Sequence, residues 1–68
     1  MVLQDKLGKN IKKVRERFGL TQADIAEKAG IHVNYYARIE RGEENPTFEV
    51  LEKIAKALKV KSSKILPF

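Results

Sequence analysis

The sequence predicts an all-α fold in which five short helices form a single domain, residues 1–68. Three observations support this fold class. Apolar residues recur at spacings of three and four, glycines and prolines separate the apolar segments, and no segment shows the alternation of apolar and polar residues that a strand requires. A chain of 68 residues is near the lower limit for one apolar core, so the helices must share that core.

The first two helices are marked by an apolar stripe and by their end signals. Gly19 ends the first helix, Thr21 is a suitable N-cap for the second, and Gly30 ends the second. Asp24 stands three residues after Thr21, where a capping box usually carries Glu or Gln. The inward stripe of the first helix is predicted to consist of Leu3, Leu7, Ile11, Val14 and Phe18.

The next two helices are separated by a turn that contains proline. The third helix is predicted from His32 to about Glu40, and Gly42 closes it. The fourth begins after Thr47, an N-cap that follows the turn residue Pro46. Its inward residues are predicted to be Phe48, Leu51, Ile54, Ala55 and Leu58.

The charge is unevenly distributed along the chain, although the net charge is +5. Residues 1–20 carry six basic and two acidic side chains, residues 21–52 carry three and seven, and residues 53–68 carry five and none. Overall basicity is therefore a weak argument for binding to a polyanion. The chain has no cysteine, which excludes disulfides and thiolate metal sites, and no apolar run approaches the roughly 20 residues that cross a bilayer. We expect a soluble, cytoplasmic protein.

The predicted third helix has two different faces. With about 100° per residue, Tyr35, Tyr36 and Ile39 share the arc expected to face the core. A carboxamide can pair with adenine, a guanidinium with guanine, and methyl groups can contact the thymine methyl. The arc opposite the core offers these groups through Val33, Asn34, Ala37 and Arg38. This outward arc is a candidate for reading bases in a major groove, although an ordinary solvent-facing surface is the alternative.

The second and third helices, over about residues 21–40, are joined by a tight turn at Gly30, which is the form of a helix-turn-helix motif. In that motif the second helix enters the major groove and the first crosses the DNA backbone. Helix N-termini present free N–H groups and a positive dipole to phosphate, so phosphate attraction need not come from lysines. An acidic central segment is therefore compatible with DNA binding.

The chain resembles the phage repressor and Cro-type helix-turn-helix family, which includes the xenobiotic-response-element-type transcriptional regulators, in the segments LTQADIAEKAGI and YYARIERGEENPTFEVLEKIAKAL. The resemblance spans residues 3–66. It implies a compact five-helix domain of the lambda-repressor-like type, with the helix-turn-helix at its second and third helices. It also implies a sequence-specific transcriptional regulator, expected to be a repressor, that binds an inverted-repeat operator in double-stranded DNA as a homodimer.

The resemblance also implies roles for individual residues, and its base-reading positions agree with the outward arc of the third helix. Gln22 corresponds to a glutamine that hydrogen-bonds phosphate and braces the recognition helix. The base-reading candidates are Val33, Asn34, Ala37, Arg38 and His32, the phosphate-binding candidates are Thr21, Gln22, Tyr35, Arg41 and Asn45, and the structural ion pair joins Arg15 to Glu40.

Two departures from the family pattern bear on DNA affinity. Glu43 and Glu44 occupy loop positions where related proteins often carry Lys or Arg, so we expect them to repel the DNA backbone. Tyr36 stands where an aliphatic residue is usual, so its hydroxyl must reach the surface or find a partner. Either Tyr35 or Tyr36 could stack on the sugar-phosphate backbone.

The C-terminal segment is apolar. Ser62 or Ser63 could cap a last short turn that contains Ile65 and Leu66. Ile65, Leu66 and Phe68 are candidates for a dimer interface, because so small a domain has difficulty burying all three. Capping of the domain's own core is the alternative role for them.

A second functional class also stays open, namely an antitoxin-like or accessory protein-interaction module with weak DNA binding, which the acidic loop favours. Catalysis is not expected, because no nucleophile or glycine-rich phosphate loop accompanies the carboxylates. His32 has no companion residues at metal-ligand spacing, so the sequence predicts no metal, cofactor or small-molecule ligand.

Overall fold

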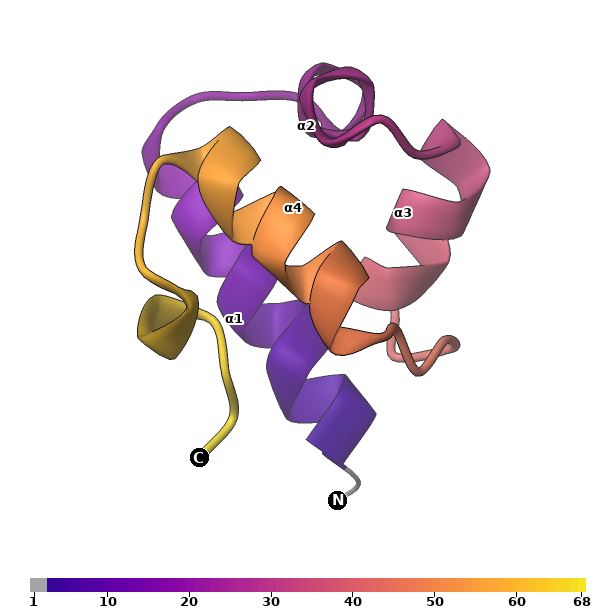
Figure 1. Ribbon diagram of the computed structural model, residues 1–68, viewed down its shortest axis with the longest axis vertical. Coiled ribbons are helices and arrows are strands. Elements are labelled where there is room, and N and C mark those ends of the chain that lie inside the picture. The colour runs from indigo at the N-terminus through magenta and orange to yellow at the C-terminus, as the bar shows by residue number, and fades with distance from the viewer. Residues whose placement is uncertain (1–2) are drawn as a thin grey trace.

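The computed structural model describes residues 3–68, and within them the chain forms four α-helices and one turn of 3-10 helix (Figure 1). The elements are α1 (Leu3–Arg17), α2 (Gln22–Ala29), α3 (Val33–Glu40), α4 (Phe48–Leu58) and the 3-10 turn η1 (Ser62–Lys64). The all-α prediction is confirmed, whereas the prediction of five helices is wrong for residues 3–68. Pro67 disfavours a helical conformation at the preceding residue, so η1 has no room to extend.

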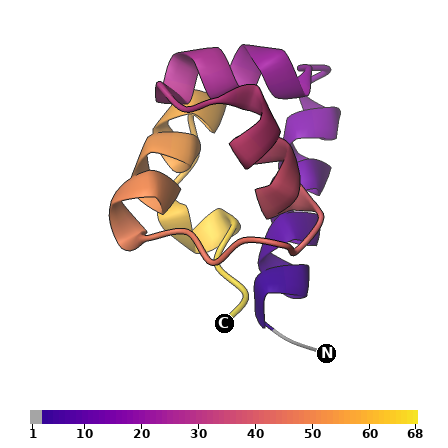
Figure 2. The ribbon, with the colours of Figure 1, turned by 90° about the vertical axis from the view of Figure 1, so that its right-hand side faces the viewer.

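The helices enclose one core from several sides. Figure 2 shows α2 across one end of the molecule, with α4 and α1 on opposite sides below it and α3 next to α1. The most extensive contacts between helices join α2 with α4, α1 with α3, and α2 with α3. The largest fully buried side chains are Ile11, Ile25, Tyr36, Ile39, Ile54, Leu58 and Ile65. No helix within residues 3–68 combines the length and the apolarity that crossing a membrane requires.

The helix starts follow the predicted caps. The Thr21 hydroxyl accepts a hydrogen bond from the Asp24 amide at 3.0 Å, and the Asp24 carboxylate accepts one from the Thr21 amide at 2.9 Å, which completes a capping box. The Thr47 hydroxyl caps α4 by accepting from the Val50 amide at 3.2 Å. The side chain of His32 caps α3, so this helix begins at Val33, one residue later than predicted.

The turn between α2 and α3 depends on the backbone of Gly30. Its φ of 71° lies in the left-handed region, which an L residue rarely adopts. In this conformation the amide of Ile31 donates to the carbonyl of Ala26 at 3.0 Å, and the chain leaves α2 at once for α3. The sequence prediction of a tight turn at Gly30 is confirmed.

Three residues predicted to face the core are instead exposed. Leu3 is 59% exposed, Phe18 52% and Phe48 79%. Leu3 and Phe48 are the first residues of α1 and α4, and Phe18 lies just beyond the end of α1, so helix packing covers each of them only in part. The predicted serine cap of the last turn is also wrong, because the N-cap of η1 is Lys61 and no side chain caps it.

The close contact between α1 and α3 requires Gly8. A Cβ atom at this position would lie 2.6 Å from the carbonyl oxygen of Ile39 and would also overlap the carbonyl of Glu40. Both obstacles are backbone atoms of α3, which cannot move aside as a side chain can. Gly8 therefore sets how closely α1 approaches the C-terminal end of α3.

Candidate nucleic-acid interface

The outward face of α3 has the composition that the sequence predicted. His32, Val33 and Asn34 are exposed at the start of α3. Ala37 and Arg38 follow one turn later and are half-buried. The opposite face is formed by the fully buried Tyr36 and Ile39, with Tyr35 half-buried between the two faces. The five base-reading candidates therefore form one contiguous surface.

The N-terminal end of this surface is fixed by His32. Its Nδ1 accepts a hydrogen bond from the backbone amide of Asn34 at 3.0 Å. This bond satisfies one of the free amides in the first turn of α3 and orders the backbone that carries the Asn34 side chain. The imidazole is thus a helix cap, and its exposed edge lies beside Val33 and Asn34.

Thr21 and Gln22 stand at the N-terminus of α2, where both were expected to meet phosphate. The Gln22 Nε2 donates to Glu40 Oε1 at 2.9 Å, which links the start of α2 to the end of α3. An amide nitrogen carries two hydrogens, so Nε2 retains a second donor for another acceptor. The Thr21 hydroxyl oxygen accepts a hydrogen bond in the capping box, and its hydrogen remains available to donate to another acceptor.

A buried ionic network lies behind the interface, centred on the carboxylate of Glu40. Arg15 Nε and Nη2 donate to its two oxygens at 2.6 and 3.0 Å, and the Tyr36 hydroxyl donates to it at 2.5 Å. Gln22 adds a fourth hydrogen bond. Arg15 Nη1 also donates to the Leu20 carbonyl at 2.8 Å. One carboxylate thereby joins α1, α2 and α3, and the Tyr36 hydroxyl has the partner that its burial requires.

These contacts determine the ionisation of the network. Burial acts to raise the pKa of Glu40, but hydrogen bonds from Arg15, Tyr36 and Gln22 outweigh burial and lower that pKa. Burial raises the pKa of Tyr36, and the hydrogen bond to Glu40 raises it further. The hydrogen bond to Glu40 raises the pKa of Arg15. Glu40 and Arg15 are therefore both charged at neutral pH. Tyr36 is fully buried, so it cannot stack on a DNA backbone.

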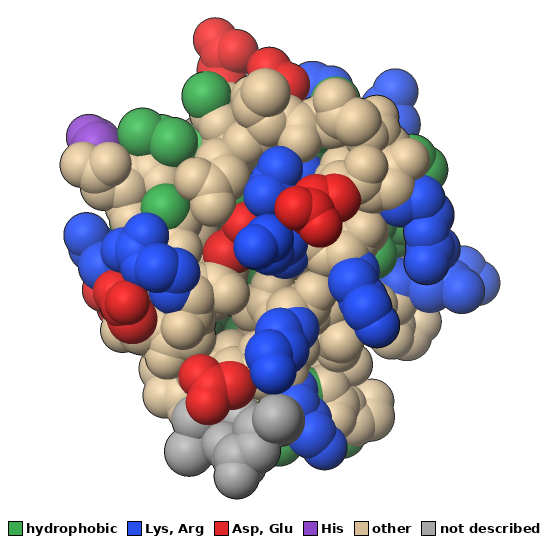
Figure 3. All heavy atoms as spheres, turned by 180° about the vertical axis from the view of Figure 1, so that it is seen from behind, with side chains coloured by type: hydrophobic (Ala, Val, Ile, Leu, Met, Phe, Trp, Pro, Cys, Tyr) green, Lys and Arg blue, Asp and Glu red, His purple; other side chains and the backbone are tan. Residues whose placement is uncertain are grey.

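The acidic loop after α3 is paired with arginines of the same face. Arg38 Nε donates to Glu44 Oε2 at 2.9 Å, and Arg41 donates through Nε and Nη2 to Glu43 at 3.0 and 3.2 Å. Figure 3 shows acidic side chains against basic ones near the edge marked by the one histidine. The Arg41 contact lowers the pKa of Glu43. Each of the two glutamates is thus paired with an arginine, and sequence reasoning missed both pairs.

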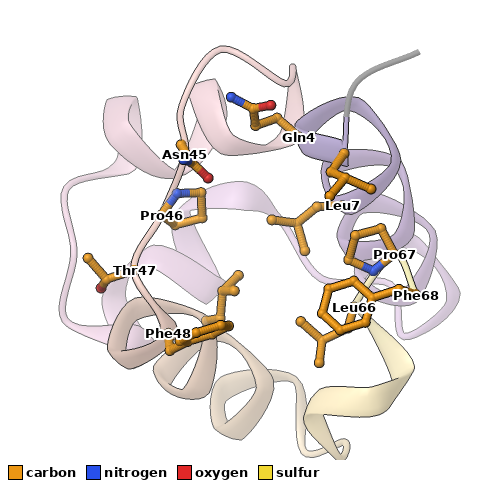
Figure 4. Close-up of a pocket in the computed structure, with 11 residues that line it drawn as sticks. Gln4, Leu7, Asn45, Pro46, Thr47, Phe48, Leu66, Pro67 and Phe68 are labelled. Atoms are coloured by element: carbon orange, nitrogen blue, oxygen red, sulfur yellow. The ribbon is translucent and has the colours of Figure 1, made fainter.

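A second surface lies where α1 and α4 begin and the chain ends. The exposed side chains of Leu3, Phe48 and Phe68 line one groove there, together with Leu66 (Figure 4). The prediction that Ile65 belongs to a dimer interface is wrong, because Ile65 is fully buried in the domain's own core. The segment is held by the Asn10 side chain, which donates to the carbonyls of Ile65 and Leu66 at 3.2 and 3.3 Å. Asn45, an exposed phosphate-binding candidate, lies at the rim of this groove.

Comparison with known proteins identifies the family of this chain. The sequence profile of a helix-turn-helix family matches residues 11–65, which is most of the chain. The chain belongs to this helix-turn-helix family. The immunity repressor protein of Bacillus phage phi105 is 42% identical to this chain over 60 residues, which cover 88% of this chain and 42% of the repressor. The chain thus spans less than half the length of that relative.

Solved structures of two restriction-modification controller proteins superpose on most of the chain. The restriction-modification controller protein C.AhdI from Aeromonas hydrophila has a TM-score of 0.90 and 27% identity, over 93% of this chain and 96% of its own. The controller C.Esp1396I bound to a 25 base pair operator site has a TM-score of 0.84 and 39% identity, over 90% of this chain and 80% of its own. The resemblance to phage repressor and Cro-type regulators is confirmed.

Proposed function

We propose that this helix-turn-helix protein is a sequence-specific DNA-binding transcriptional regulator that acts in the cytoplasm as a repressor. The observation that carries the proposal is the contiguous outward face of α3. It presents a carboxamide, a guanidinium and methyl groups while the buried network behind it holds the helix in place. The similarity to a controller protein bound to its operator site supports the same function.

The proposed mode of binding places α3 in the major groove, with Val33, Asn34, Ala37 and Arg38 toward the base edges. The start of α2 then meets the DNA backbone, where the second Nε2 hydrogen of Gln22 and the hydroxyl of Thr21 donate to phosphate oxygens. Because Gln22 also donates to Glu40 at the end of α3, the phosphate contact and the base contacts belong to one connected unit.

The test is selection of preferred duplexes from a randomised pool, followed by binding measurements on point-mutated duplexes. We expect an enriched motif with two-fold symmetry. Asn34→Ala and Arg38→Ala should each lose about 1 to 3 kcal/mol of discrimination at particular base pairs, because each removes one base-edge contact. Fluorescence anisotropy on duplexes changed one position at a time measures this loss.

Gln22→Ala is the matched comparison in the same experiment. Its contact is with phosphate, so we expect it to weaken binding to all duplexes by a similar factor. Circular dichroism confirms that each variant retains its helices. If Arg38→Ala kept full discrimination at every position, the assignment of the reading face would be wrong.

We propose that the groove between the chain ends is the site of homodimerisation on an inverted-repeat operator. Leu3, Phe48 and Phe68 place large apolar surface in water around one concavity, which is unfavourable unless another surface covers it. A second copy of the chain offers the same apolar side chains, as a two-fold interface requires. Dimerisation would set two α3 helices about one helical turn of DNA apart, near 34 Å.

Phe48→Glu should abolish this dimer. Phe48 is 79% exposed and is the first residue of α4, where a carboxylate is favourable, so the folded monomer should tolerate the change. Phe18→Glu is the matched control, because Phe18 is also exposed but lies outside the groove. Sedimentation equilibrium measures the association. Dimerisation that survives Phe48→Glu, or is lost equally in Phe18→Glu, would show that the interface lies elsewhere.

A further inference from the structure

The loop after α3 places a carboxylate on the candidate base-reading arginine. Glu44 Oε2 accepts a hydrogen bond from Arg38 Nε at 2.9 Å. The loop itself folds back on the same residue, because the amide of Glu43 donates to the carbonyl of Arg38 at 2.8 Å. Glu44 is thus held close to Arg38 by the backbone as well as by the ion pair.

This contact engages one edge of the guanidinium and leaves its far end free. Among the residues that the structure describes, Nε is the donor of Arg38 that has a partner. Its two terminal amino groups therefore remain as donors, which is the pair that can reach O6 and N7 of guanine together. The Arg38 side chain is 42% exposed, so its free end is accessible to a duplex.

We propose that Glu44 is a positioning residue that orients Arg38 for base reading and so raises discrimination while lowering affinity for every duplex. The inference rests on the proposed base-reading role of Arg38. An arginine held in place before binding loses less side-chain entropy when it meets the correct base. The Glu44 charge also opposes the approach of phosphates whatever the sequence, which weakens non-specific binding.

The neighbouring ion pair supplies an internal control. Glu43 carries the same charge, is one residue away and pairs with Arg41. Arg41 is a phosphate-binding candidate, and phosphate contacts carry no sequence information directly. Loss of Glu43 should therefore change the charge of the loop as loss of Glu44 does, without changing which base is preferred.

The experiment compares Glu44→Ala, Glu44→Gln and Glu43→Ala on the duplex selected from the randomised pool, on its single-position mutants and on a scrambled duplex. Both alanine variants should bind the scrambled duplex more tightly than the unmodified protein. Glu44→Ala should reduce discrimination about three- to tenfold at the base pair assigned to Arg38, the scale expected for ordering one long side chain. Glu43→Ala should change discrimination by less than about twofold at every position.

Glu44→Gln separates orientation from charge. Its amide oxygen can still accept from Arg38 Nε, so discrimination should stay closer to that of the unmodified protein than to that of Glu44→Ala, while binding to the scrambled duplex rises. This inference fails if Arg38→Ala loses discrimination at one base pair and Glu44→Ala does not. It also fails if Glu43→Ala loses as much discrimination as Glu44→Ala. In both cases the proposed function stands. If no duplex is preferred over another, the proposed function fails and this inference fails with it.

Discussion

Glu40→Gln should lower the free energy of unfolding by about 3 to 5 kcal/mol, the range found when one partner of a buried ion pair is removed. The Glu40 side chain is 2% exposed and the Arg15 side chain 11%, so the variant would leave the guanidinium charge buried without its counter-charge. The core of so small a domain often supplies only about 3 to 5 kcal/mol of stability in total. At the upper end of the expected effect, the variant is therefore largely unfolded at room temperature. Urea denaturation followed by circular dichroism measures the change.

Two further variants keep this prediction testable. Tyr36→Phe removes one of the four hydrogen bonds to the carboxylate and should cost about 1.5 to 3 kcal/mol, which leaves a measurable transition. Glu16→Gln makes the same chemical change at an exposed position of α1 and should shift stability by less than about 0.5 kcal/mol. Equal effects of Glu40→Gln and Glu16→Gln would contradict a structural role for the network.

The same carboxylate predicts a pH dependence with a definite sign. The pKa of Glu40 is lower in the folded protein than its ordinary value of 4.5, so its contribution to stability is present above that value. The contribution is lost as the pH falls through the folded pKa. The stability difference between the unmodified protein and Glu40→Gln should therefore shrink as the pH is lowered from 7 through 4.5 and beyond.

Gly8→Ala should destabilise the domain by about 1 to 3 kcal/mol or more, even though alanine is the better helix former by about 1 kcal/mol. The added methyl would lie 2.6 Å from the carbonyl oxygen of Ile39, so α1 must move away from α3. Such a shift would also strain the bond between Arg15 on α1 and Glu40 on α3. Thermal denaturation measures the effect.

Lys9→Ala is the matched control for this second prediction. It places alanine at the adjacent exposed position of α1 and should change stability by less than about 0.5 kcal/mol. A Gly8→Ala variant as stable as the unmodified protein would show that α1 and α3 can separate without loss.

Features that depend on neighbouring residues could be predicted from the sequence. The capping box of Thr21 and Asp24, the Thr47 cap and the turn at Gly30 each rest on interactions within a few residues, and all are present. The outward arc of α3 followed from helical periodicity, because Tyr36 and Ile39 alone suffice to orient an eight-residue helix.

Features that depend on how helices cross could not be predicted in this way. Periodicity gave Phe48 an inward position, but it cannot tell where the partner helices stop covering α4. Gly8 stands in the middle of α1, and only the position of α3 shows why a side chain is excluded there. The pairing of Arg38 with Glu44 spans six residues across a loop whose path no periodicity describes.

The four hydrogen bonds on Glu40 have a consequence for the proposed complex with DNA. They lock three helices to one another, so the distance from the proposed phosphate-binding end of α2 to the proposed base-reading face of α3 has little freedom to adjust. In that complex the duplex must adapt its groove width and bending to the fixed arrangement of α2 and α3. Base pairs that no side chain touches should influence affinity through the ease with which they deform.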